Sequence, residues 1–288
     1  MEELKWTGER LVTEIVDQHG SVEHLHRYAL AAQIVENKIV LDIASGEGYG
    51  SHLLSYNAKA VYGVDISDEA VTHSKSKYKR ENLTFMKGSA SEIPLDDAAI
   101  DVVVSFETIE HLAEHEKMML EIKRVLKPGG VLLISSPEKD NYRFREKDNP
   151  FHIKELYLDE FTALLKDHFT NHKMLTQRFV YGSIVSRIDD AGEPAGFSFF
   201  DGDYLKITNR IPDAGATDTI HNRPYFNIAL ASDSDLDRIT LPDTSFFNAI
   251  QIYHNELQKI RNSHSYRIGN RLLKPLSFFK QLMLKFKG

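Results

Sequence analysis

A predicted strand that runs directly into closely spaced glycines is the feature that most constrains the fold of this chain. Residues 40–50 read Val-Leu-Asp-Ile-Ala-Ser-Gly-Glu-Gly-Tyr-Gly. Glycine is needed where the backbone turns tightly and approaches a ligand without an intervening Cβ atom. The next predicted strand, 60–64, leads into Asp65, 17 positions after Gly48, where a carboxylate can hold a ribose diol. This pattern predicts a nucleoside-binding βαβ unit; a tight turn without a ligand is the alternative.

Apolar runs and amphipathic stretches alternate along the chain and predict an α/β fold. The spacing predicts strands at 38–43, 60–64, 83–86, 100–106 and 131–136, and helices at 21–36, 49–57, 68–80, 113–126 and 154–167. Such alternation implies right-handed crossovers and a mostly parallel sheet. Two further β-rich runs, 169–179 and 225–231, are expected to pair as an antiparallel edge. Residues 187–222 are rich in Gly, Asp and Pro and are expected to form an insertion or lid over the sheet.

Composition excludes several classes of protein. The 288 residues are 42% apolar and 27% charged, a globular composition with enough chain for a full core. The absence of cysteine excludes disulfide frameworks, thiolate nucleophiles and Cys-ligated metals, so any metal must be held by His and carboxylate. The N-terminus lacks the apolar core of a signal peptide, and no 18 apolar residues run together. We therefore expect a soluble, cytoplasmic protein.

Charge is distributed unevenly along the chain. The total of 35 Lys+Arg and 42 Asp+Glu gives −7, yet residues 261–288 hold seven basic residues and no acidic one. The first 260 residues therefore carry −14 and the tail carries +7. An acidic body argues against a nucleic-acid partner, whereas the basic tail indicates a partner of its own.

The tail also carries a helical pattern. Leu272, Leu276, Phe279, Met283 and Phe286 follow one another at steps of 4, 3, 4 and 3, which places them on one stripe of a helix flanked by lysines. A basic amphipathic helix can lie on an anionic membrane surface or dock on a partner protein. For the preceding stretch, 244–262, a core helix or the contact of a homodimer is an equal alternative.

The loop spacing Gly-x-Gly-x-Gly after Asp42 favours a cationic or zwitterionic ligand over a dinucleotide, since a carboxylate is poorly placed beside a phosphate. Here the sequence resembles the class I S-adenosylmethionine-dependent methyltransferases. The resemblance covers about residues 6–180 and continues through Asp65, Gly-Ser-Ala at 88–90, Ile-Pro-Leu at 93–95, Asp-Val-Val-Val-Ser at 101–105 and Arg-Val-Leu-Lys-Pro-Gly-Gly at 124–130. It implies a Rossmann-like sheet of seven strands, mostly parallel with an antiparallel edge strand, and a helical C-terminal extension.

This resemblance also implies a division of the chain and a set of cofactor-binding residues. Residues 1–36 would cover the cofactor, 37–235 would form the methyltransferase domain, and 243–288 the helical basic tail. Gly46 and Gly48 would line the methionine end, Asp65 the ribose, Ile66 the adenine face and Ser89 with Ala90 the adenine edge. Further candidates at the cofactor are Asp42, Phe106 and Arg27. Arg27 would pair with the methionine carboxylate, unless it is simply a solvated helix residue.

A cluster of acid and imidazole follows the predicted strand 100–106. Residues 107–111 read Glu-Thr-Ile-Glu-His, at the end of the sheet where α/β proteins collect their reacting groups. The cluster looks like the Glu-x-x-Glu-His site of metal-using O-methyltransferases, with His152 as the further downstream histidine. We predict Glu107, His111 and His152 as catalytic residues, and Glu107, Glu110, His111 and His152 as ligands of Mg²⁺ or a similar ion. Metal-free acid–base use and a structural role remain alternatives.

Three short stretches further indicate the acceptor. Residues 6–10, 23–28 and 265–271 look like parts of proteins linked to bacterial surface-polysaccharide synthesis. The expected function is therefore O-methylation of a sugar or glycan precursor with S-adenosylmethionine, at the inner face of the membrane if the tail binds lipid. The alternatives are a quinone-type or RNA 3′-end O-methyltransferase, a non-catalytic cofactor-binding scaffold and, least favoured, an NAD oxidoreductase.

Overall fold

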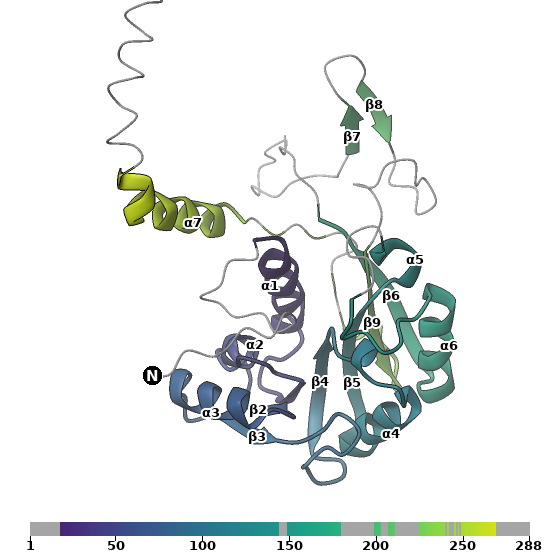
Figure 1. The fold of residues 1–288 in the computed structure, drawn as a ribbon. Coiled ribbons are helices and arrows are strands. Elements are labelled where there is room, and N and C mark those ends of the chain that lie inside the picture. Colours follow the sequence, from purple (N-terminus) through teal and green to yellow (C-terminus); the bar gives the residue numbers. More distant parts are fainter. Residues whose placement is uncertain are drawn as a thin grey trace, which may run out of the picture.

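A central seven-stranded sheet organises the computed structural model of the chain (Figure 1). The structure describes residues 18–143, 149–179, 199–202, 207–210 and 225–268, apart from 240, 242–244, 246 and 248. The strand order is β3-β2-β1-β4-β5-β9-β6. These strands span β1 (Ile39–Ile43), β2 (Ala60–Asp65), β3 (Leu83–Lys87), β4 (Ile100–Phe106), β5 (Leu126–Pro137), β6 (Asn171–Gln177) and β9 (Phe226–Ser232).

The register confirms the predicted mixture of parallel and antiparallel strands. β1 pairs in parallel with β2 and β4, β2 with β3, and β4 with β5. β9 runs antiparallel between β5 and β6. The parallel strands therefore end together at one edge of the sheet, and this is the edge at which ligands bind in open α/β folds.

Helices cover both faces of the sheet, because the strands are apolar on both sides. They span α1 (Gln18–Ala32), α2 (Tyr49–Leu54), α3 (Asp68–Lys77), α4 (His115–Val125), α5 (Lys139–Tyr142), α6 (Leu158–His168) and α7 (Ile250–Asn262), with a 3-10 turn, η1, at Ile109–His111. One core cluster joins α4 and α6 to the sheet through Met118, Ile122 and Phe161. The other joins α1 and α2 to the opposite face through Tyr28, Ala31 and Leu54.

Some boundaries differ from the sequence-based predictions. α6 begins at Leu158 rather than at 154, where the Glu160 carboxylate accepts a hydrogen bond from the Tyr157 N–H at 3.0 Å and closes the first turn. β5 begins at Leu126 and includes the Lys-Pro-Gly-Gly turn, in which Gly129 takes a φ of 77°. In the expected insertion at 187–222, the described residues form a two-stranded antiparallel sheet of β7 (Phe199–Gly202) and β8 (Ile207–Arg210), so the insertion carries regular structure that its sequence did not indicate.

Other predictions fall on residues that the structure does not describe. Residues 6–10 and the apolar stripe at 272–286 lie outside the described residues. The division of the chain into a cofactor-covering segment (1–36), a methyltransferase domain (37–235) and a basic tail (243–288) stays a prediction. α1 does pack on the sheet as part of its core. Within the described residues, no helix has both the length and the apolar character needed to cross a bilayer.

Candidate functional site

Asp42 lies at the centre of the edge where β1 ends and is almost wholly buried. Its carboxylate accepts hydrogen bonds from the Ser51 hydroxyl at 2.6 Å and from the Tyr28 hydroxyl at 3.1 Å. Burial raises the pKa of Asp42 from 3.8 to about 6, against the opposing effect of the two hydroxyls. A carboxylate held in this way is suited to a cationic ligand group.

The glycine loop after β1 has the geometry that its sequence predicted. Ala44, Gly46 and Gly48 take φ values of 60°, 55° and 92°, in the region that L side chains rarely adopt. A Cβ atom on Gly48 would lie 2.8 Å from both the Phe85 ring and the Ser74 hydroxyl. Position 48 therefore needs glycine, both for its positive φ and because the Phe85 ring and the Ser74 hydroxyl occupy the space that a side chain would take.

Asp65 is held against this loop at the end of β2. Its Oδ2 accepts from the Gly46 backbone N–H at 2.8 Å and its Oδ1 from the Ser67 N–H at 2.9 Å. Each carboxylate oxygen keeps further acceptor capacity for hydroxyl groups. Ile66, the next residue, leaves 70% of its surface exposed, which fits the apolar wall predicted for a base.

The turn predicted at the adenine edge is fixed by hydrogen bonds. The Gly88 N–H donates to the Asp65 carbonyl at 3.0 Å, which links the turn to β2. The Ser89 hydroxyl contacts the Ser91 hydroxyl at 3.0 Å, and Ala90 is buried. The turn therefore lies beside the acidic residue that was predicted to hold the ribose.

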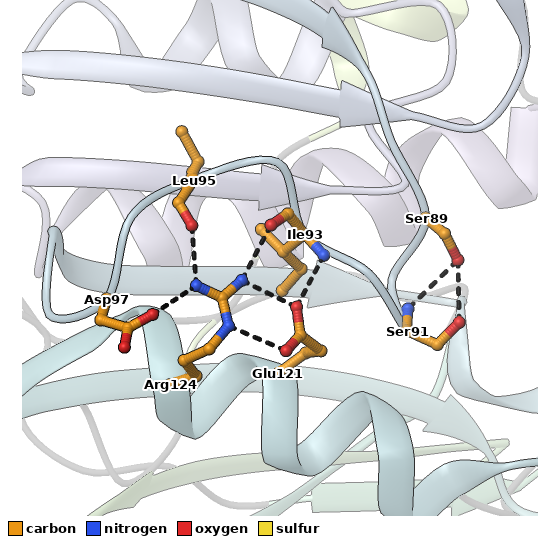
Figure 2. A network of polar contacts seen from close by, with 7 residues as sticks. All are labelled: Ser89, Ser91, Ile93, Leu95, Asp97, Glu121 and Arg124. Atoms are coloured by element: carbon orange, nitrogen blue, oxygen red, sulfur yellow. Dashed lines mark hydrogen bonds and ion pairs between the residues drawn. The ribbon is translucent and has the colours of Figure 1, made fainter.

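Arg124 and Glu121 of α4 hold the segment that follows this turn (Figure 2). The Arg124 guanidinium donates to both Glu121 carboxylate oxygens at 2.8 Å. It also donates to the Ile93 and Leu95 carbonyls at 2.8 Å and to Asp97 at 2.7 Å, while Glu121 accepts from the Ile93 N–H at 2.8 Å. These bonds keep the pKa of Glu121 below its usual value and tie α4 to the chain leaving the adenine edge.

Arg27 of α1 reaches the same edge and is only 1% exposed, which excludes the solvated alternative. Its Nη1 donates to Gln177 Oε1 at 2.8 Å and lies 3.5 Å from Glu107 Oε1. The guanidinium also lies 4.7 Å from the centre of the Phe226 ring and 5.9 Å from that of Phe106. Among the described residues, its Nε and Nη2 find no hydrogen-bond acceptor, so the site offers two buried donors to an anionic group.

Glu107, one of the four predicted metal ligands, lies beside Arg27 in the structure. Its Oε1 accepts from the Ser135 hydroxyl at 2.6 Å, and its φ of 50° turns the chain sharply at the end of β4. The candidate metal-binding group in the described residues contains Glu110, His111 and His152, without Glu107. The structure thus brings together three of the four predicted ligands, and metal binding stays a prediction.

Glu110, His111 and His152 present ligand atoms that lie within 4.8 Å of one another. The His111 and His152 ring centroids are 5.2 Å apart. His111 Nδ1 lies 3.0 Å from the Phe151 carbonyl, and His152 Nδ1 lies 2.5 Å from Glu155 Oε1. A neutral histidine that donates from Nδ1 to such an acceptor carries its lone pair on Nε2, the nitrogen that a metal ion or a proton uses.

Several residues of the site were missed by the sequence analysis. Gln177 and Ser135 hold Arg27 and Glu107 from positions 150 and 28 residues away, and Tyr28 holds Asp42 from the preceding helix. Hydrogen bonds between distant elements leave no local pattern in a single sequence. Arg124 did lie in a quoted motif, and its spacing of three residues from Glu121 on one helix face was an available signal.

The chain is similar in sequence to methyltransferases. Residues 41–134 match the family model of a methyltransferase domain. Two relatives, from Mycobacterium tuberculosis and Mycolicibacterium smegmatis, are described as probable S-adenosylmethionine-dependent methyltransferases and are each 36% identical, over 167 and 166 residues. Each alignment covers 57% of this chain, and 60% and 64% of the two relatives, so the chain spans less than two thirds of the length of these curated relatives.

A more distant relative is the phthiotriol/phenolphthiotriol dimycocerosates methyltransferase 1 of Mycobacterium ulcerans. It is 27% identical over 147 residues, which are 48% of this chain and 54% of that protein.

Solved structures show the same fold. A methyltransferase solved with the Haloferax volcanii Trm112 methyltransferase activator has a TM-score of 0.52 at 20% identity, over 76% of this chain and 91% of that one. A Thermotoga maritima protein described as a possible histamine N-methyltransferase also has a TM-score of 0.52, at 16% identity, over 75% and 92% of the two chains. The predicted Rossmann-like class I methyltransferase fold is confirmed.

Acidification is expected to weaken ligand binding through Asp42. With a pKa of about 6, its carboxylate loses its charge as the pH falls from 7 to 5. The dissociation constant of S-adenosylmethionine should therefore rise about tenfold over this range, because only the ionised form attracts the cationic ligand. Calorimetric titration at pH 7, 6 and 5 measures this change, and Asp42→Asn should remove it.

The stability contribution of Asp42 should change in the opposite direction. A carboxyl whose pKa is raised by folding binds more protons in the folded state, so its contribution to the free energy of unfolding increases as the pH falls from 7 to 4. Weaker binding of S-adenosylmethionine at pH 5 would therefore not result from a loss of the stability that Asp42 contributes to the folded protein. A dissociation constant that stays constant from pH 7 to 5 would contradict the role given to Asp42.

Removing the Arg124 guanidinium should loosen the adenine edge. Arg124→Met should lower the free energy of unfolding by about 1–3 kcal/mol, since several hydrogen bonds are lost, and should weaken S-adenosylhomocysteine binding. Lys166→Met provides the control, because Lys166 is exposed on α6 and takes no part in the Arg124 contacts described above. Chemical denaturation and calorimetry measure the two effects. Equal affinities for Arg124→Met and Lys166→Met would show that the Arg124 contacts do not position this turn.

Proposed function

We propose that this chain, whose residues 18–268 contain a class I methyltransferase fold, is an enzyme that transfers the methyl group of S-adenosylmethionine to a hydroxyl oxygen. The observation that carries the proposal is the joint placement of the glycine loop, Asp42, Asp65 and Arg27 at one edge of the sheet. These groups match a zwitterionic nucleoside: two carboxylates, a glycine loop at the end of β1 and a buried guanidinium.

The buried guanidinium of Arg27 supports a carboxylate ligand at the methionine end. Burying a charged group is unfavourable unless its hydrogen bonds are completed. Glu107 and Gln177 both contact Nη1, whereas Nε and Nη2 have no hydrogen-bond acceptor among the described residues. A carboxylate can accept from two guanidinium nitrogens at once, so the α-carboxylate of the cofactor completes this site.

The two histidines supply the proton acceptor in the proposed reaction. The sulfonium methyl is already electrophilic, so the protein has to align donor and acceptor and accept the acceptor's hydroxyl proton. His111 and His152 each offer the Nε2 lone pair, and Glu155 holds the His152 ring in place through Nδ1. Asn149 Nδ2 lies 3.3 Å from His152 Nε2, and an acceptor hydroxyl would take over this position. Glu107, which we also proposed as catalytic, acts here by orienting Arg27.

The same histidines with Glu110 fit a divalent cation. Two imidazole nitrogens and one carboxylate oxygen form a ligand set that Mg²⁺, Mn²⁺ or Zn²⁺ can use, and the Glu155 contact to His152 is the type of outer hydrogen bond that orients metal-binding histidines. A bound cation would lower the pKa of an acceptor hydroxyl. The residues that would hold it are Glu110, His111 and His152.

A sugar or glycan-precursor hydroxyl is the acceptor that we propose. Three stretches of sequence that look like polysaccharide-synthesis proteins support it, and the net charge of −14 over residues 1–260 disfavours RNA. A lipid hydroxyl is the second candidate, supported by the relative named for phthiotriol and phenolphthiotriol dimycocerosates. Methyl-labelled S-adenosylmethionine, incubated with separated nucleotide sugars, lipid-linked glycans and apolar bacterial lipids, distinguishes these acceptors by the fraction that becomes labelled.

We place the reaction in the cytoplasm, where S-adenosylmethionine is available, and at the inner face of the membrane when the tail engages lipid. A homodimer through α7 remains a candidate arrangement. A scaffold that binds the cofactor without catalysis would retain calorimetric binding of S-adenosylhomocysteine but would label none of the three fractions.

His111→Ala and His152→Ala should each lower kcat by about 10²–10⁴-fold, the usual contribution of general acid–base catalysis, with little change in the KM for S-adenosylmethionine. His172→Ala is the control, because His172 lies on β6 at the level of Ala231, away from the edge that carries the site. Steady-state release of S-adenosylhomocysteine measures both constants. Normal turnover in both variants would refute the proposed base.

The metal has its own test in the same assay. Excess EDTA followed by Mg²⁺ or Mn²⁺ should abolish and then restore turnover if Glu110, His111 and His152 hold a required ion. Full turnover in EDTA would refute the metal and leave the histidines as metal-free bases.

A further inference from the structure

The end of α7 and the short helical segment after it stand apart from the catalytic body. Every residue from 257 to 268 is exposed. α7 contacts α1, and Figure 1 shows it extending from there away from the sheet, on the side toward which the parallel strands point. The proposed function names both a lipid surface and a second copy of the chain as partners for this end of the protein and does not choose between them.

Large apolar side chains are exposed along this segment. Leu257 and Ile260 are 52% and 51% exposed on one side of the last turns of α7, and Tyr266 and Ile268 are 45% and 58% exposed beyond Ser263. An isolated helix that leaves such residues in water is expected to bury them against another surface.

The charges that accompany these residues are all of one sign. Residues 257–268 contain Lys259, Arg261 and Arg267 and no acidic residue, and the sequence adds five more basic residues and no acid up to residue 288. By contrast, residues 1–256 carry 27 basic and 42 acidic residues. A surface of negative charge would attract this segment and repel the body, which would orient the protein on it.

We propose that residues 257–268 dock on an anionic lipid surface. Leu257, Ile260, Tyr266 and Ile268 insert at the level of the headgroups, and the basic residues bind lipid phosphates and carboxylates. A lipid surface fits better than a protein groove, because the apolar side chains lie on two short helical segments interrupted at Ser263, whose ψ of 146° is extended. A fluid surface accommodates such a break, whereas a groove for a continuous helix does not.

Docking has a consequence that rests on the proposed function. α7 contacts α1, the helix that carries Arg27, so docking of residues 257–268 would hold this helix, and the cofactor site proposed at Arg27, near the membrane. Docking itself does not depend on catalysis, and its test is independent of turnover.

Flotation of the full-length chain with vesicles tests the proposal. Vesicles of phosphatidylcholine with about 30% phosphatidylglycerol should float the protein at low salt, and vesicles of phosphatidylcholine alone should not. Leu257→Glu with Ile260→Glu should reduce the floated fraction about tenfold. Leu120→Glu is the matched control, because Leu120 is an exposed leucine on α4 at 61% exposure, and it should float like the wild type.

Two further measurements make the outcome decisive. S-adenosylhomocysteine affinity should be the same in both variants and the wild type, which shows that the body is folded and separates docking from the proposed function. Equal flotation of the Leu257→Glu, Ile260→Glu variant and the wild type would overturn the proposal. So would concentration-dependent dimerisation that this variant abolishes without any flotation of the wild type, because a second copy of the chain would then cover the segment.

Discussion

The buried carboxylate of Asp42 is the interaction on which the candidate site depends. It lies in β1 at the middle of the sheet and is held by Tyr28 of α1 and Ser51 of α2. One side chain thus holds both α1 and α2, the helix that follows the glycine loop. Burial keeps its pKa near 6, so at neutral pH a negative charge is maintained where water is excluded. A ligand that brings positive charge would offset that cost.

The rest of the site is arranged in two parts around this charge. Gly46, Gly48 and Asp65 form the part that would accept the nucleoside. The hydrogen bond from the Gly46 backbone N–H to the Asp65 carboxylate holds the glycine loop against the end of β2. Arg27 and Glu107 form the other part, with the histidines beyond them on η1 and the segment leading to α6. A cofactor lying across Asp42 would join the two parts, which places its reactive end toward His111 and His152.

Much of the fold could be predicted from the sequence, because βαβ units have local signatures. Strand 40–43, the glycines and Asp65 occur within 26 residues, and the structure places them as predicted. Arg27 could be proposed only by resemblance, since its partner Gln177 is 150 residues away. The separation of Glu107 from the other three predicted metal ligands has a similar cause. Sequence spacing placed it three residues from Glu110, but the positive φ at Glu107 turns the chain between them, and Ser135 holds it on the side of Arg27.

The acceptor is less constrained than the cofactor for a physical reason. Cofactor-binding residues lie on strands and their adjoining turns, whose positions the sheet fixes. Acceptor specificity commonly resides in loops, and between 180 and 224 the structure describes only β7 and β8. The match to the methyltransferase family model covers residues 41–134. This part of the chain holds most of the proposed cofactor site, and the expected insertion at 187–222 lies outside it.

Calorimetric titration of residues 1–288 with S-adenosylhomocysteine, with Arg27→Met and NAD⁺ in parallel, tests whether the methyl donor binds at this edge of the sheet. We expect one bound S-adenosylhomocysteine per chain and no binding of NAD⁺. The affinity should be at least about tenfold weaker in Arg27→Met, because a buried charged hydrogen-bonding partner is lost. Absence of binding to the folded wild type, or an unchanged affinity in Arg27→Met, would contradict binding of the methyl donor at this edge.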